Sequence, residues 1–130
     1  MKEHVYIIAA GSNTADAHIR VEEALRAVAI MARGAVRASR SMLTEPVDFP
    51  TTSPFVNLVA EVRTPLAPSQ VHQRLKAIEA AAGRRPGDKA RGRVVVDVDV
   101  VAVDGRVTRP ADWGRAYVRT LAGELGLEVG

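Results

Sequence analysis

The sequence predicts an α+β fold of the ferredoxin-like type: β-α-β-β-α-β with an antiparallel sheet, plus a C-terminal hairpin and short helix. Three observations predict it. Two segments repeat apolar residues at helical spacing, and each is followed by a glycine. The segments around them are apolar or alternating over strand lengths. Their order matches a split βαβ sheet with both helices on one face, and residues 1–130 are expected to form one domain.

The N-terminal part of the chain predicts a buried strand and a helix. Residues 5–10 are apolar and run into a Gly-Ser-Asn turn, as a buried strand does. Thr14 or Asp16 is expected to cap the helix that follows, and Gly34 to end it. The apolar stripe of this helix consists of Val21, Leu25, Val28 and Ala32.

Two strands and a loop are expected between the helices. Residues 35–43 alternate weakly and predict a second strand, and residues 55–63 alternate well and predict a third. Residues 44–54 contain three prolines and four Ser or Thr, which predicts a loop. On the third strand, Phe55 and Asn57 fall on the same face.

The second half begins with a helix that opens near Pro68 and ends at Gly83. Its stripe consists of Val71, Leu75, Ile78 and Ala82. Residues 84–93 then form a loop with five basic residues, two glycines and a proline. Asp104-Gly105 predicts a hairpin turn into a short strand over residues 106–108. Asp112 is expected to cap a last helix, which carries Val118, Leu121 and Leu125.

Asp97 and Asp99 interrupt a valine-rich segment, residues 94–101, that otherwise predicts a buried strand. Side chains alternate along a strand, so both carboxylates point to one face while Val96 and Val98 point to the core. Two neighbouring carboxylates repel each other and resist burial, so a positive group is expected to face them. A wet strand face paired with lysines and arginines meets that need, and so does a Mg²⁺ site.

Composition excludes several classes of protein. The chain is 47% hydrophobic and 25% charged, as soluble globular proteins are, and it has no cysteine for a disulfide or a thiolate metal site. It shows neither an apolar run of membrane-spanning length nor a signal-peptide pattern, so we expect a cytoplasmic protein with no membrane partner. We also expect a monomer. The net charge of +3 and pI near 9.8 favour an anionic ligand.

Several short segments, in order along the chain, resemble the motifs of the 6-hydroxymethyl-7,8-dihydropterin pyrophosphokinases of folate synthesis. They are Tyr6–Asn13, Thr44–Val47, Pro54–Asn57, Thr64–Pro68, Ile78-Glu79, Gly83-Arg84, Asp97–Asp99 and Arg115–Val118. The resemblance covers nearly the whole chain and suggests a short and divergent member of that family.

Such a resemblance implies Mg²⁺-dependent transfer of a diphosphate group from ATP, the co-substrate, to the hydroxymethyl group of a reduced pterin. It implies two Mg²⁺ ions held by Asp97 and Asp99, and Arg84 and Arg93 as catalytic arginines. The nucleotide contacts that it implies are Lys76, Glu79, Arg91 and Arg115. The pterin contacts that it implies are Gly11, Thr44, Glu45, Val47, Phe55, Asn57 and Tyr117.

These residue types suit the implied chemistry, and each also has a purely structural interpretation. Carboxylates bind Mg²⁺, arginine forks bind phosphate, and aromatic faces with a side-chain amide suit a pterin ring. Phe55 is also typical of a core, Asn57 of a residue that satisfies backbone groups, and Tyr117 of a helix anchor. Glu79 is equally typical of a solvated glutamate paired with Lys76 or Arg84.

The sequence departs from the family pattern mainly on the nucleotide side. Val94 stands where the family has an arginine ahead of its metal strand, with Arg93 one residue early. Arg91 replaces a loop tryptophan, Lys76 replaces a glutamine, and residues 108–113 contain no histidine. The hypothesis is that this chain binds reduced pterin normally, binds ATP weakly and turns over slowly, with Arg84 as its main phosphate contact.

Two other functions remain open. One is a catalytically weakened pterin- or nucleotide-binding protein on the same fold. The other is a basic nucleic-acid-binding module, although such sheets need several exposed aromatic residues and this chain has few. Mg²⁺ dependence separates them, because the kinase needs the ion at Asp97 and Asp99 and RNA binding does not.

Overall fold

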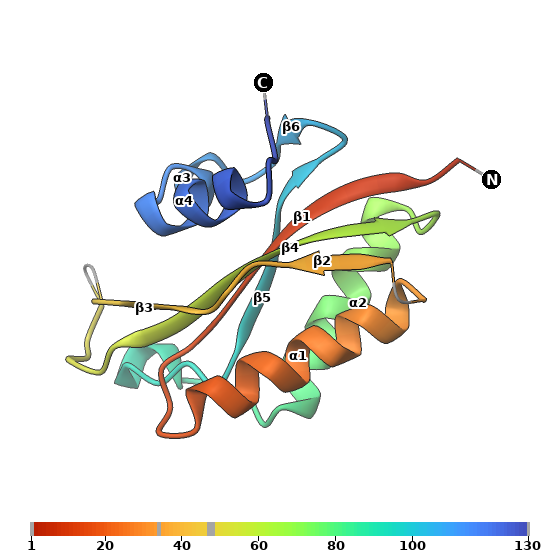
Figure 1. Cartoon of the computed structure of the whole chain (residues 1–130). Helices are drawn as coiled ribbons and strands as arrows, with labels where there is room; N and C mark the ends of the chain where they lie inside the picture. The colour runs from red at the N-terminus through yellow and green to blue at the C-terminus, as the bar shows by residue number, and fades with distance from the viewer. Residues whose placement is uncertain (1, 34, 47–48, 130) are drawn as a thin grey trace.

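The computed structural model describes residues 2–33, 35–46 and 49–129 and confirms the α+β fold (Figure 1). The described elements are β1 (His4–Ser12), α1 (Ala17–Met31), β2 (Val36–Ala38), β3 (Met42–Thr44), β4 (Phe55–Thr64), α2 (Pro68–Ala81), a 3₁₀ turn η1 (Lys89–Arg91), β5 (Asp97–Val103), β6 (Arg106–Val107), α3 (Pro110–Trp113) and α4 (Ala116–Glu124). The strands form one antiparallel sheet in the order β2-β4-β1-β5-β6, and β3 also pairs with β4.

Helices cover both faces of this sheet (Figure 1). α1 and α2 lie on one face, as the sequence predicts, and their apolar stripes bury Val21, Val28, Val71 and Leu75. α4 lies on the other face and packs Val118 and Leu121 against Ile7, Val59 and Val101. Because the sheet is buried on both sides, β1 is apolar at successive positions instead of alternating.

The predicted second strand, residues 35–43, is in fact two short strands, and this part of the prediction is wrong. β2 and β3 both pair with β4, and Ser39 lies between them. The Ser39 hydroxyl accepts the N–H of Val59, and the Ser39 N–H donates to the Val59 carbonyl oxygen. The Ser39 side chain thus accepts the Val59 N–H, which a regular β-ladder would pair with a backbone carbonyl. This exchange interrupts the strand at Ser39. Thr44, predicted in the loop, is the last residue of β3.

The strand that carries the two aspartates begins later than predicted. β5 starts at Asp97 because Val94 is held by the turn that follows β1. The Val94 N–H donates to Asn13 Oδ1 at 2.7 Å, and the Asn13 N–H donates to the Val94 carbonyl at 3.0 Å. Asn13 Nδ2 also donates to the Gly92 carbonyl at 2.8 Å. These bonds fix the end of residues 84–93, hereafter the basic loop, against β1. Val96 and Val98 still enter the core as predicted.

The predicted caps are less accurate than the predicted helices. Asp16 precedes α1, but its side chain does not cap the helix; it accepts from Thr14 Oγ1 and pairs with Arg20. The expected stop at Gly34 lies outside the described residues, whereas Gly83 ends α2 in a left-handed conformation with φ of 98°. Asp112 lies inside α3, so its assignment as the cap of the last helix is wrong; Arg115 precedes α4.

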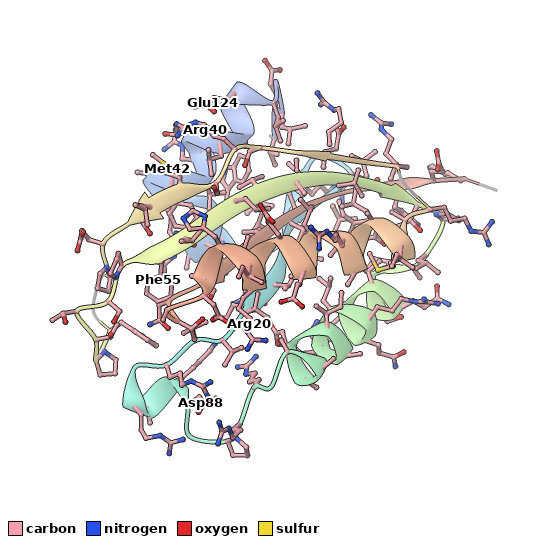
Figure 2. All side chains as sticks on the ribbon, turned by 60° about the horizontal axis from the view of Figure 1, so that its bottom comes forward. Arg20, Arg40, Met42, Phe55, Asp88 and Glu124 are labelled. Carbon is pink, nitrogen blue, oxygen red and sulfur yellow. The ribbon has the colours of Figure 1, made fainter. Side chains whose placement is uncertain are left out.

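A bidentate ion pair holds α4 to the segment between β2 and β3. Arg40 Nε and Nη2 each lie 3.0 Å from a carboxylate oxygen of Glu124 (Figure 2). Arg37 adds a hydrogen bond from its Nη2 to the Leu125 carbonyl oxygen at 3.1 Å. The helix that carries Tyr117 is therefore placed by both the apolar core and these polar contacts. Within the described residues, the helices are all too short or too polar to cross a membrane.

Candidate active site

A cavity of about 690 Å³ opens where the end of β1 meets the starts of β4 and β5. β3, the start of the following loop and the α3–α4 segment complete its walls. It is the place where chain segments distant in sequence bring together most of the residues singled out above. Those that line it are Gly11, Thr44, Glu45, Phe55, Asn57, Val94, Asp97, Asp99, Arg115 and Tyr117.

Gly11 and Asn57 form the floor of the cavity on neighbouring strands, where they are paired in register. A Cβ atom on Gly11 would lie 2.5 Å from Asn57 Oδ1, so only glycine leaves room for the amide. Asn57 is 4% exposed, and its Nδ2 donates to Thr44 Oγ1 at 2.6 Å. The amide is thus held in one orientation by a side-chain bond from β3.

Aromatic side chains lie on two sides of the cavity. Phe55 comes from the start of β4 (Figure 2), and Tyr117 comes from α4. Burial raises the pKa of the Tyr117 hydroxyl, so this group is neutral at physiological pH. Phe49 packs edge-on against Phe55, with ring centroids 5.8 Å apart, and also lines the cavity. Phe49 was not predicted from the sequence, because it lies in a proline-rich loop without periodicity. The predicted contact Val47 lies outside the described residues.

Asp97 and Asp99, hereafter the aspartate pair, point into the same cavity from β5. The expected positive partners are present among the described residues. Arg84 Nη1 lies 3.6 Å and Lys89 Nζ 3.3 Å from Asp97, and Arg109 Nη1 lies 3.7 Å from Asp99. Burial raises the pKa of Asp99. The positive charge of Arg109 lowers this pKa, and the negative charge of Asp97 raises it further.

The aspartate pair also has the properties of a hard-cation site. Asp97 Oδ1 is buried and has no hydrogen-bond partner among the described residues, which leaves a full carboxylate lone pair unsatisfied. The described residues offer no cluster of three or more His, Cys, Asp or Glu side chains. Two carboxylates match Mg²⁺, which keeps waters and binds substrate phosphates beside one or two protein ligands. The donor set therefore fits Mg²⁺ better than a metal that needs several protein ligands.

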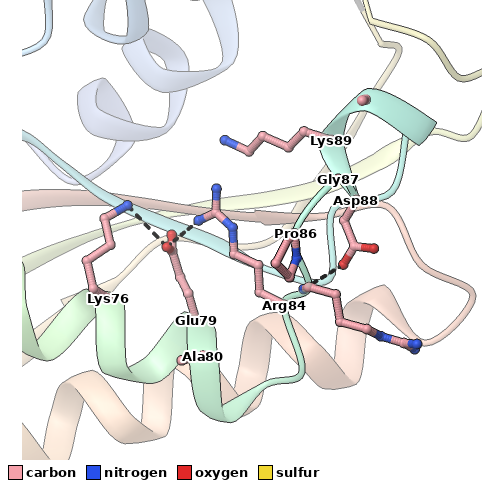
Figure 3. A pocket seen from close by; sticks show the side chains of 10 residues that line it. Lys76, Glu79, Ala80, Arg84, Pro86, Gly87, Asp88 and Lys89 are labelled. Carbon is pink, nitrogen blue, oxygen red and sulfur yellow. Dashed lines mark hydrogen bonds and ion pairs between the residues drawn. The ribbon is translucent and has the colours of Figure 1, made fainter.

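A second, adjoining pocket of about 530 Å³ lies between α2 and the basic loop, and Glu79 is at its base (Figure 3). Glu79 is 1% exposed, so the interpretation as a solvated residue is wrong, whereas its expected pairing with Lys76 and Arg84 is confirmed. Its Oε1 accepts from Arg84 at 2.5 Å and from Lys76 at 3.2 Å. Its Oε2 accepts the backbone N–H of Val98 at 2.8 Å. One carboxylate therefore links α2, the basic loop and the strand that carries the aspartate pair.

Arg91 and Arg93 of the basic loop pair with Asp88, which is labelled in Figure 2, instead of with the aspartate pair. Arg91 and Arg93 approach Asp88 at 3.1 and 3.4 Å, and the Arg85 N–H donates to it at 2.9 Å. The backbone bond from Arg85, followed by the charges of Arg93 and Arg91, lowers the pKa of Asp88. Of the two predicted catalytic arginines, the structure thus brings Arg84 to the aspartate pair and Arg93 to Asp88.

Basic residues that sequence analysis did not assign also reach the cavity. Lys89 comes from η1, and Arg109 comes from the segment between β6 and α3. Arg109 and Arg115 both pair with Asp112, at 2.5 and 3.4 Å. Only the position of Lys89 within the basic loop gave any signal of its role. Arg109 sits in a segment with no recognisable motif, so tertiary structure was needed to find it.

The comparisons with known proteins agree with the motifs. Residues 7–125 match the family model described as 7,8-dihydro-6-hydroxymethylpterin-pyrophosphokinase. Proteins from two strains of Porphyromonas gingivalis, ATCC 33277 and W83, are each 27% identical over 128 residues. Both are named 2-amino-4-hydroxy-6-hydroxymethyldihydropteridine pyrophosphokinase, and each match covers 88% of this chain and 86% of the relative.

One solved structure is similar at a lower level. It is an X-ray crystal structure described as an amidohydrolase/peptidase from Burkholderia cenocepacia, with a TM-score of 0.42 and 16% identity. The match covers 98% of this chain and 34% of that chain. A likeness of this size supports no argument about the site.

Proposed function

The chain belongs to the 7,8-dihydro-6-hydroxymethylpterin pyrophosphokinase family and is a diphosphokinase transferase, and from this premise we propose its reaction and the roles of its residues. It transfers the diphosphate of ATP to the hydroxymethyl group of 6-hydroxymethyl-7,8-dihydropterin, in folate biosynthesis. The observation that carries the proposal is the shared cavity: Asp97, whose Oδ1 accepts no hydrogen bond within the described part of the chain, lies in the same cavity as Phe55, Asn57 and Tyr117.

The proposed reaction is a displacement at phosphorus. The hydroxymethyl oxygen of the pterin attacks the β-phosphorus of ATP, and the bond from that phosphorus to the oxygen bridging the α-phosphate breaks. AMP leaves with the bridging oxygen, and the hydroxyl proton passes to solvent. With ATP as co-substrate, the aspartate pair would hold Mg²⁺, whose charge would offset that of the phosphate oxygens. The protein contributes mainly position and charge in such a transfer.

The pterin side of the cavity is proposed to orient the acceptor. Phe55 and Tyr117 contact the two faces of the ring, and Phe49 supports Phe55 through its edge-on contact. Asn57, held by Thr44, reads the amide-like edge of the pterin with both a donor and an acceptor. Gly11, which has no side chain, leaves space for that ring, and Glu45 and Pro46 complete the wall.

The nucleotide side is proposed to depend on Arg84 first. Arg84 reaches the aspartate pair and is held by Glu79, so it is positioned for the transferring phosphates. Lys76, Arg91 and Arg115 are proposed to supply further positive charge toward the nucleotide. Val94 is 5% exposed and bound through its backbone to Asn13, so the family's arginine is replaced here by a buried apolar side chain. This supports weak ATP binding and slow turnover.

The test is to incubate the protein with Mg²⁺-ATP and 6-hydroxymethyl-7,8-dihydropterin and measure AMP release. We expect AMP to form only with all three components present and to disappear in Asp97→Asn. A protein that binds both ligands and forms no AMP would instead be the weakened binding protein, which the pairing of Arg93 with Asp88 favours. Nucleic-acid binding is not favoured, because helices cover both faces of the sheet.

A further inference from the structure

Arg109 occupies a fixed position on the edge of the cavity. Its backbone N–H lies 3.4 Å from the Val101 carbonyl oxygen, and its own carbonyl accepts the N–H of Trp113 at 2.9 Å. Its side chain is 53% exposed and faces the cavity that contains the aspartate pair. A half-exposed arginine with a fixed backbone is accessible to a ligand without any rearrangement of the main chain.

Two carboxylates share the guanidinium of Arg109 in different ways. Nε donates to Asp112 Oδ2 at 2.5 Å, which is a direct charge-assisted hydrogen bond. Nη1 lies 3.7 Å from Asp99 Oδ1, a distance at which the two groups attract as charges without a hydrogen bond. Asp112 is held in turn by Arg115 at 3.4 Å. The contact with Asp112 therefore anchors the guanidinium, and the contact with Asp99 is the replaceable one.

We propose that Arg109 is a further phosphate-binding residue of this site, which neutralises Asp99 until a metal ion replaces it and then binds the polyphosphate that arrives with the metal. A divalent ion on Asp99 repels a guanidinium a few ångströms away. Asp112 prevents the Arg109 side chain from moving far. The repulsion between the guanidinium and the metal ion must therefore be offset by an anion that lies between them. The phosphate half of this proposal rests on the proposed function, and the competition with metal does not.

The proposal predicts effects of opposite sign, which a merely structural role would not produce. Removing the charge of Arg109 removes a competitor for Asp99, so metal alone should bind about two- to fivefold more tightly, the scale of a partly exposed ion pair. The same change removes a phosphate contact, so metal-nucleotide should bind about tenfold more weakly. The net result is a loss of coupling between metal and phosphate binding.

The experiment uses the full chain with Arg109→Gln and, as a matched control, Arg106→Gln. Arg106 lies three residues away on β6, is exposed, and makes no ion pair among the described residues. Calorimetry measures binding of Mn²⁺ alone and of α,β-methylene ATP with saturating Mg²⁺. We expect tighter Mn²⁺ and weaker nucleotide binding in Arg109→Gln, and no change of either in the control. Circular dichroism checks that each variant is folded.

Unchanged Mn²⁺ affinity in Arg109→Gln, or weakening of both ligands together, would overturn the proposal. If Arg109→Gln does not fold, Arg109→Lys is the test: it keeps the charge and loses the planar fork, so Mn²⁺ binding should match the parent while nucleotide binding weakens. Parent-like nucleotide binding in Arg109→Lys would then overturn it. If the parent releases no AMP but Arg109→Gln still gains Mn²⁺ affinity, the proposed function fails and the competition between Arg109 and the metal stands.

Discussion

Glu79→Gln is the most informative single change, because one buried carboxylate joins three elements of the site. The substitution keeps the volume of the side chain and removes its charge. Both oxygens of Glu79 now accept hydrogen bonds, from Lys76 and Arg84 on one side and from the Val98 N–H on the other. A glutamine has one oxygen and one NH₂ group, so a donor must face a donor on one of the two sides.

The expected cost is smaller than for a fully buried ion pair. Removing one partner of such a pair costs about 3–5 kcal/mol. Here Arg84 and Lys76 are 33% and 47% exposed, so water solvates the charges that Glu79 leaves behind. The cost that remains is the mismatched buried hydrogen bond, about 1–3 kcal/mol. For a chain of this size that corresponds to a fall in melting temperature of roughly 3–10 °C.

The assay is thermal unfolding followed by circular dichroism, beside calorimetric titration with Mg²⁺ and α,β-methylene ATP. Glu23→Gln, on the exposed face of α1, makes the same charge change without a buried partner and is the matched control. We expect Glu79→Gln to melt lower and to bind nucleotide more weakly, because Arg84 loses the contact that orients it. Melting and nucleotide affinity equal to those of Glu23→Gln would refute the inference that Glu79 organises the site.

Three further changes test other parts of the structure. Asp99→Asn should abolish Mg²⁺ binding in calorimetry and raise the melting temperature slightly without metal. Burial holds the folded pKa of Asp99 above its usual 3.8, so the parent loses stability as pH rises from that value through the folded pKa. The variant should lose this pH dependence, and a parent-like pH profile would contradict the argument. Phe55→Ala should weaken pterin binding in fluorescence titrations by about 1–3 kcal/mol and Asn57→Ala should weaken it with less loss of stability; if Asn57→Ala unfolds the protein while pterin still binds, Asn57 is structural. Gly11→Ala should reduce pterin affinity and lower the melting temperature, because its Cβ would lie 2.5 Å from Asn57 Oδ1, and Gly123→Ala, where a Cβ meets no atom within 4 Å, should do neither.

The elements that repeat with a period were predictable from the sequence. The stripes of α1 and α2, the strand β4 and the stop at Gly83 were each predicted from local spacing, and the structure contains all of them, although β4 is buried on both faces. The break between β2 and β3 was not predictable, because it depends on a bond between the Ser39 hydroxyl and Val59, a residue of another strand. The start of β5 likewise depends on Asn13, a residue of the β1 turn.

The same distinction explains which site residues were found. Strand alternation determines which sheet face each strand residue points to. A motif and the strand register together therefore place five such residues in one cavity: Gly11, Phe55, Asn57 and the aspartate pair. The basic residues have no such constraint, because the side chain of an arginine in a loop reaches in any direction.

The partners of these arginines are set by where buried carboxylates lie. Glu79 and Asp88 are 1% and 4% exposed, and an isolated buried carboxylate is costly, so each must attract the nearest basic groups. Asp88 thereby pairs with Arg93, which sequence alone assigns to catalysis, and Glu79 holds Arg84 beside Asp97. Arg109 lies near Asp99 because a second, half-buried carboxylate, that of Asp112, anchors its guanidinium at the edge of the cavity. The cations that we propose to meet a phosphate here are therefore selected by the protein's own acidic residues, and three of them lie near the aspartate pair although residue 94 is a valine.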